Sequence, residues 1–180
     1  GVHINARIIR EYPLSSTTVS AVGYVGRITS TDLSNLGPNY SASNFIGKLG
    51  AEKAFEDLLH GTVGYQQAEV NATGNIVRKL KETPPISGNS IYLTIDSKLE
   101  KTAIDALGKV SGAVVAIQPQ TGEILALVSN PAYDPNLFVT GISQTDYNRL
   151  RNAPSNPLYN RAIRGEYPLA STIKPFLSLV

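Results

Sequence analysis

The tetrapeptide Ser171-Thr-Ile-Lys174 has the residue types and the spacing of a nucleophile with its base. Residues three apart on a helix share a face, so the Lys174 amine can lie beside the Ser171 hydroxyl. A neutral lysine amine can take the hydroxyl proton while the oxygen attacks a carbonyl carbon. By composition alone, however, about one such match is expected in a chain of this length, where it would be a helix cap followed by an exposed lysine.

The residues around this tetrapeptide also fit an acyl-transfer site. Pro175 is tolerated only near the start of a helix, which predicts a helix that begins just before Ser171. The backbone N–H of Ser171 would then have no intrahelical partner and would lie at the positive end of the helix dipole. That N–H could form one half of an oxyanion hole.

Other kinds of chemistry have little support in the sequence. The chain has no cysteine, which excludes disulfides and thiolate nucleophiles, and only two histidines, His3 and His60, far apart. We therefore expect no metal site and no Ser-His-Asp triad. The net charge of +2 argues against nucleic-acid binding through phosphate neutralisation. No apolar run approaches the ~18 residues that a membrane-spanning helix needs.

The first half of the chain is predicted to hold short elements separated by polar loops. They are a strand within 19–28, a brief helix over 32–36 capped by Ser30 or Thr31, a helix over 50–60 ending at Gly61, and a hairpin of strands 65–70 and 76–80. Two prolines and a Gly-Asn pair within 83–89 then interrupt the pattern. We place a domain boundary there, with domains 1–86 and 87–180.

The second half has a more regular pattern. A strand is predicted over 91–95 and is followed by a helix that Ser97 and Glu100 open as a capping box. The apolar face of this helix is formed by Leu99, Ala103, Ala106 and Leu107. The remaining predicted elements are a hairpin over 113–128, a short helix capped by Ser143 and Asp146, and the start of the helix near Ala170. The predicted fold class is therefore α+β.

Five ordered blocks resemble the class B penicillin-binding proteins, and in particular those of the cell-elongation machinery. The most specific block lies within 159–176, where Asn-Arg-Ala, Gly-x-Tyr-Pro and Ser-x-x-Lys-Pro follow one another. The blocks over 47–61, 93–99, 118–129 and 133–138 resemble the family's pedestal signature, the entry to its transpeptidase domain, and the strand pair and loop that follow. The resemblance implies a pedestal lobe of mixed strands and a helix, then the N-terminal part of a transpeptidase α/β domain.

The chain departs from the family pattern in two ways. Ala170 stands where the family usually has glycine, just before the nucleophile. The family's Ser-x-Asn and Lys-Thr-Gly motifs are expected after the nucleophile, and neither follows Lys174 here. Ser87-Gly-Asn89 precedes it within the predicted linker, and Lys101-Thr-Ala103 lacks the glycine, so we interpret both as chance matches. We expect a piece of a longer protein that is inactive alone.

The resemblance implies a peptidoglycan D,D-transpeptidase with Ser171 as nucleophile and Lys174 as base. Its substrates would be stem peptides ending in D-Ala-D-Ala, β-lactams would acylate Ser171, and no metal or organic cofactor is implied. Its partners would be a membrane glycosyltransferase of the SEDS family and rod-shape scaffold proteins. The parent would lie in the bacterial inner membrane on the periplasmic side, with an anchor outside this sequence.

Two alternatives share some of these features. The pedestal-like half could act as a non-catalytic module that binds partners of the elongation machinery. A penicillin-sensing receptor or a serine β-lactamase would also carry Ser-x-x-Lys, but the pedestal-like residues 1–86 disfavour both.

Overall fold

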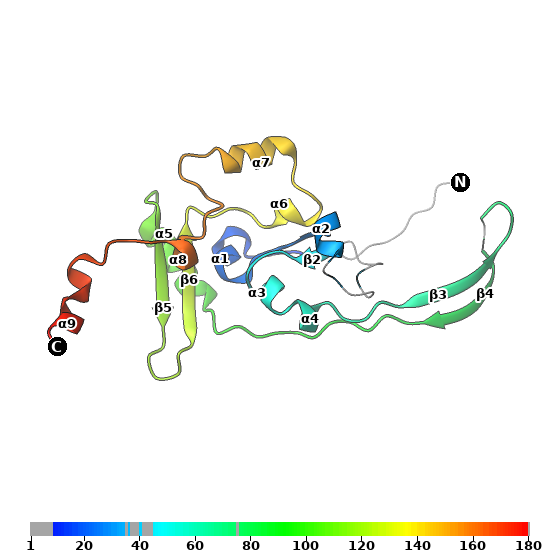
Figure 1. Ribbon diagram of the computed structural model, residues 1–180, viewed down its shortest axis with the longest axis horizontal. Helices are drawn as coiled ribbons and strands as arrows, with labels where there is room; N and C mark the ends of the chain where they lie inside the picture. Colours follow the sequence, from blue (N-terminus) through cyan, green and yellow to red (C-terminus); the bar gives the residue numbers. More distant parts are fainter. Residues whose placement is uncertain (1–8, 35, 37–39, 41–44, 75, 180) are drawn as a thin grey trace.

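The computed structural model describes residues 9–34, 36, 40, 45–74 and 76–179. Three antiparallel two-stranded sheets lie along an elongated molecule, with short helices between them (Figure 1). This confirms the α+β class. In chain order the elements are η1 Ser15–Thr17, α1 Val19–Val22, β1 Val25–Arg27, α2 Ser30–Leu33, β2 Phe45–Gly47, α3 Gly50–Ala54, α4 Glu56–Leu59, β3 Tyr65–Val70, β4 Ile76–Thr83, α5 Ser97–Leu107, β5 Gly112–Ile117, β6 Ile124–Asn130, α6 Asn136–Val139, α7 Gln144–Arg151, α8 Arg161–Arg164, η3 Ala170–Ile173 and α9 Lys174–Leu177.

The apolar alternation predicted a strand within 19–28, but this segment is not one strand. It forms the helical turn α1 and then the short strand β1, because Gly23 ends the turn with φ +76°. The following helix α2 is capped by Thr29, one residue before the predicted cap. The Asp32 N–H donates to Thr29 Oγ1 (3.2 Å), and the Thr29 N–H donates to the Asp32 carboxylate (2.7 Å).

The single helix predicted over 50–60 is divided at Phe55 into α3 and α4. The most buried residue of this segment is an acid, Glu52, which is 4% exposed. Its carboxylate can be buried because Arg10 donates two hydrogen bonds to it (2.7 and 3.0 Å). Tyr12 donates its hydroxyl to Glu52 (3.1 Å) and accepts from the Val25 N–H (2.7 Å). Burial and the nearby Glu52 carboxylate raise the pKa of the Tyr12 hydroxyl. This network joins the N-terminal segment to α3.

The hairpin of β3 and β4 is confirmed, with Gly74 at φ +80° in its turn. It extends away from the rest of the molecule (Figure 1), and no residue of either strand is buried. After it, the chain returns past α4, where the Asn89 N–H donates to the Leu58 carbonyl (2.8 Å). The Ser-x-Asn match at 87–89 therefore lies in this connecting segment.

The predicted strand over 91–95 is wrong. This segment forms no ladder; a side-chain bond from Thr94 Oγ1 to the Ile124 carbonyl (2.7 Å) and a backbone bond from the Asp96 N–H to Leu125 (2.8 Å) hold its end to β6. The boundary at 86/87 stays a prediction.

The helix α5 begins as predicted near 97, but its cap and its buried face differ. Asp96 is the N-cap and accepts from the Lys98 and Leu99 N–H groups (2.8 and 3.2 Å). Glu100 is fully buried against β6, where it accepts from the Leu127 N–H (3.2 Å), so it cannot complete a capping box. Leu99 is 37% exposed and does not belong to the buried face.

The second hairpin, β5 with β6, is confirmed as antiparallel, and Ser143 caps α7 as predicted. The core lies where α1, α5 and α8 pack on β6, with Val19, Ala126 and Val128 buried there.

Two contacts join the two halves of the chain on one side of this core. Asn136 exchanges two hydrogen bonds with the backbone of Tyr12 (2.9 and 3.0 Å). Tyr24 stacks on Phe138 with ring centroids 4.4 Å apart. The halves therefore pack directly on each other.

Candidate active site

The segment that leads to Ser171 is anchored at its start by buried polar groups. The Ser129 hydroxyl donates to the Tyr159 carbonyl (3.2 Å) and accepts from the Arg161 N–H (2.9 Å). Asn160 caps α8 by accepting from the Ala162 N–H (3.2 Å). These bonds fix the start of α8 beside the end of β6.

Arg161 ties the preceding loop to the same point. Its guanidinium donates to the carbonyls of Ser155 (2.6 Å) and Asn156 (3.1 Å) and lies over the Tyr159 ring, 5.8 Å from its centroid. The Tyr159 hydroxyl in turn donates to the Arg164 carbonyl. The Asn-Arg-Ala motif thus stabilises the local fold of the segment that precedes Ser171.

The segment that contains Ser171 starts with a tighter turn than the sequence predicted. Residues Ala170–Ile173 form the 3₁₀ turn η3, and the α-helical turn α9 begins only at Lys174. Ala170 has φ +47°, the left-handed region that glycine adopts at low cost. The Thr172 N–H donates to the Leu169 carbonyl (3.2 Å), which closes the turn on its N-terminal side.

Ser171 lies in the 3₁₀ turn η3 and Lys174, three residues later, is the first residue of α9; both are exposed. Within the described part of the chain, neither side chain has a hydrogen bond or an ion pair. The two residues are therefore placed on one local element, without a contact between the hydroxyl and the amine. Their assignment as nucleophile and base stays a prediction.

A metal centre has no structural counterpart among the residues that the structure describes, since no three acidic or histidine side chains gather there. His60 pairs with Glu56 (3.2 Å) and packs on the Tyr40 ring, while His3 lies outside the described residues. No helix in the described ranges is long and apolar enough to cross a membrane.

Sequence reasoning missed the residues that hold the approach to Ser171. Ser129 and Asn160 were quoted only within the blocks that resemble the family. Ser20, whose carbonyl accepts from the Asn160 amide (3.0 Å), was not singled out. A signal did exist, because Ser129 and Asn130 end an otherwise apolar strand, and buried polar groups of this kind are nearly always hydrogen-bonded.

Two family patterns match this chain in order. The "Penicillin-binding Protein dimerisation domain" matches residues 1–93, and the "Penicillin binding protein transpeptidase domain" matches residues 112–180. The chain therefore belongs to the class B penicillin-binding proteins.

Within that class, the relatives indicate the penicillin-binding protein 2 branch. The chain is 49% identical over 176 residues to peptidoglycan D,D-transpeptidase MrdA of Acinetobacter baumannii, covering 97% of this chain and 26% of that relative. It is 47% identical over 184 residues to MrdA of Escherichia coli (strain K12), covering 99% of this chain and 29% of the relative. It thus spans well under a third of the length of either.

Solved structures show the same fold. PBP2 of Pseudomonas aeruginosa, solved in complex with WCK 5153, superposes with a TM-score of 0.84 at 49% identity, covering 96% of this chain and 35% of that one. PBP2 of Helicobacter pylori, solved in complex with MreC, gives 0.82 at 34% identity, covering 95% and 32%. The arrangement described above is therefore that of a pedestal followed by the start of a transpeptidase domain.

Proposed function

We propose that this chain is the pedestal and nucleophile segment of a peptidoglycan D,D-transpeptidase that acts in cell-wall elongation. The observation that carries the proposal is the match of residues 112–180 to the transpeptidase domain, since Ser171 and Lys174 lie within it at Ser-x-x-Lys spacing. The anchoring of α8 by Ser129 and Asn160 supports it, because this leads the chain to Ser171 along a fixed path.

The reaction is acyl transfer between two peptidoglycan strands. Ser171 Oγ attacks the carbonyl of the penultimate D-Ala while its proton passes to a neutral Lys174 amine. The C–N bond to the terminal D-Ala breaks, and that residue leaves with a proton returned by the base. The amine of a second strand then attacks the acyl-enzyme and forms the cross-link. A β-lactam acylates the same oxygen by ring opening.

The test is covalent labelling of the full-length protein with penicillin, located by mass spectrometry. We expect one adduct on Ser171, none in Ser171→Ala, and labelling at least ~10²-fold slower in Lys174→Ala, the usual scale for a lost general base. Ser178→Ala is the matched control, because this exposed serine lies on the last turn and its hydroxyl donates to the Pro175 carbonyl (2.8 Å). An adduct that persists in Ser171→Ala would refute the assignment.

A second function, partner binding by the pedestal, is favoured by the complex of Helicobacter pylori PBP2 with MreC. We propose that residues 1–86 bind rod-shape scaffold proteins and a membrane glycosyltransferase of the SEDS family, at the periplasmic face of the inner membrane. The unpaired faces of the β3–β4 hairpin offer a surface for this.

The two functions can be separated by one pair of variants. Full-length Ser171→Ala should bind an MreC-type scaffold protein with unchanged affinity in biolayer interferometry, although it no longer reacts with penicillin. Leu80→Glu, on the exposed hairpin, should retain penicillin labelling and lose scaffold binding about tenfold. Unchanged binding by Leu80→Glu would remove the hairpin from this proposal.

A further inference from the structure

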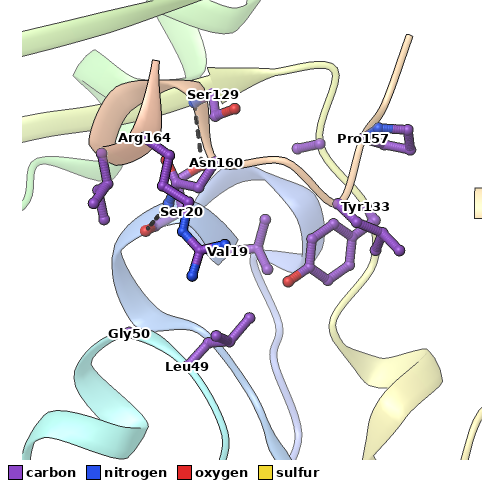
Figure 2. Close-up of a pocket in the computed structure, with 12 residues that line it drawn as sticks. Val19, Ser20, Leu49, Gly50, Ser129, Tyr133, Pro157, Asn160 and Arg164 are labelled. Carbon is purple, nitrogen blue, oxygen red and sulfur yellow. Dashed lines mark hydrogen bonds between the residues drawn. The ribbon is translucent and has the colours of Figure 1, made fainter. Parts of the chain in front are cut away.

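A pocket of about 200 Å³ lies at the junction of the two halves, away from Ser171. One side is formed by α1 and the start of α3, and the other by residues 129–133 and 157–164 (Figure 2). Its volume equals that of roughly seven water molecules at the ~30 Å³ that each occupies in the liquid. The pocket therefore suits a small organic molecule.

The walls of this junction pocket are mainly apolar. They are formed by aliphatic and proline side chains from both halves, namely Val19, Leu49, Pro157, Leu158 and Ile163. No aspartate or glutamate is among its lining residues. The pocket can therefore bind the apolar part of a ligand, whereas the ammonium group of a ligand would have no acidic partner.

Some polar groups at the pocket already have hydrogen bonds. Asn160 donates its amide to the Ser20 carbonyl (3.0 Å) and accepts from the Ala162 N–H, and both bonding directions of the Ser129 hydroxyl are used. The Asn160 bond to Ser20 joins the two halves, the Ser129 hydroxyl holds the segment around Tyr159, and neither group is available to a ligand.

Three other groups can still donate. Ser20 is 8% exposed, and its hydroxyl accepts from the Ser129 N–H (3.1 Å), but within the described ranges its own hydrogen has no acceptor. The Tyr133 hydroxyl and the Arg164 guanidinium likewise have no hydrogen-bond or ion-pair partner in the described part of the chain. In Figure 2 both side chains point toward Val19 from opposite sides. The polar groups of the pocket that can still bind a ligand are thus hydrogen-bond donors, and one of them, Arg164, carries a positive charge.

We infer that the junction pocket binds a small monocarboxylate with a short aliphatic body. The carboxylate would pair with Arg164 and accept from the Tyr133 and Ser20 hydroxyls, which are the partners that a carboxylate needs when it leaves water. The aliphatic body would lie against Val19 and Leu49. Because the ligand contacts both halves, it binds their packed arrangement and stabilises it by mass action.

The experiment titrates hexanoate into the full-length protein and follows binding by ligand-observed NMR and the melting temperature. Hexylamine and 1-hexanol, which have the same chain with a different head group, serve as matched probes. We expect hexanoate to bind at least tenfold more tightly than either and to raise the melting temperature.

Two variants locate the site and one controls for surface charge. Arg164→Gln should weaken hexanoate binding about tenfold, and Tyr133→Phe, which keeps the ring that packs against Tyr24 and Phe138, about threefold. Arg151→Gln, an exposed arginine at the end of α7, should change nothing. Penicillin labelling of Ser171 is measured on the same samples, so that failure of the proposed nucleophile is recognised independently.

Three outcomes would overturn the inference. Equal binding of hexylamine and hexanoate would remove the anionic preference, and unchanged binding in Arg164→Gln would place the ligand elsewhere. Tighter binding of acetyl-D-alanyl-D-alanine than of hexanoate at this pocket would make it a peptide site. The absence of any hexanoate binding at millimolar concentration would also refute it.

Discussion

Ala170 has the backbone conformation that glycine adopts most easily, one residue before the proposed nucleophile. A left-handed φ of +47° costs an alanine about 1–2 kcal/mol, of which the greater flexibility of glycine in the unfolded chain offsets part. We therefore expect Ala170→Gly to stabilise the turn by about 0.5–1 kcal/mol. Hydrogen exchange of the amides that close it, those of Thr172 and Lys174, should slow severalfold.

The control for this prediction is Ala162→Gly in α8, where the alanine is helical. That change should destabilise its helix by about 1 kcal/mol, the ordinary effect of glycine in a helix. Faster exchange at Thr172 in Ala170→Gly would show that the left-handed conformation is not the dominant one.

Glu100 is a second residue in unfavourable surroundings, because its burial disfavours the ionised carboxylate. Its carboxyl is fully buried, Oε1 accepts from the Leu127 N–H, and Oε2 has no hydrogen-bond partner among the described residues. Burial raises the pKa of this carboxyl above its ordinary 4.5. The folded state then binds the proton more tightly than the unfolded state, so stability is lost as pH rises from about 4.5 through the folded pKa.

Glu100→Gln should remove this part of the pH dependence, because the amide is neutral throughout. In urea unfolding, the free energy of unfolding of the variant relative to the wild type should rise by about 1–3 kcal/mol between pH 4.5 and pH 8. This is the range of the desolvation cost of a buried polar group without a hydrogen-bond partner. Glu123→Gln, on the exposed turn between β5 and β6, is the control and should show no such gain. A pH-independent difference between Glu100→Gln and the wild type would contradict the argument.

At the scale of elements, the N-terminus of α5 tests which residue caps it. Asp96 accepts two backbone N–H bonds there, whereas Ser97 is the first helical residue. Asp96→Ala should therefore cost about 1 kcal/mol of unfolding free energy. Ser97→Ala should cost little, because alanine is a better helix former. The reverse order in thermal unfolding would restore the capping box that the sequence predicted.

The elements that formed as predicted are those whose determinants are local. The two hairpins are set by strand residues on either side of a glycine turn, and α7 by a serine cap with Asp146 three residues later. The helix over 50–60 was divided and the strand over 91–95 did not form. Glu52 of α3 is held by Arg10 and the end of 91–95 by the edge of β6, and both partners are distant in sequence. Local patterns cannot report such partners.

At the scale of the whole molecule, the exposure of the candidate site makes a prediction about the 180-residue chain alone. Ser171 and Lys174 are both exposed, and nothing in the described part of the chain encloses them or holds the hydroxyl against the amine. We expect no Ser171-dependent labelling of the purified chain by a fluorescent penicillin over hours, whereas full-length protein is labelled. Stoichiometric labelling of the chain would show that it holds a complete site.

The sequence by itself determined the α+β class, both hairpins and the cap of α7. Each of these depends on neighbours within a few residues, whose spacing is visible in the chain. Only the tertiary structure decided that Glu52 and Glu100 are buried, that Ser129 and Asn160 fix the approach to Ser171, and that the halves enclose a pocket with unused donors. The physical reason is that burial and hydrogen-bond partners are supplied by residues remote in sequence, and the cost or gain of a polar group depends on those partners.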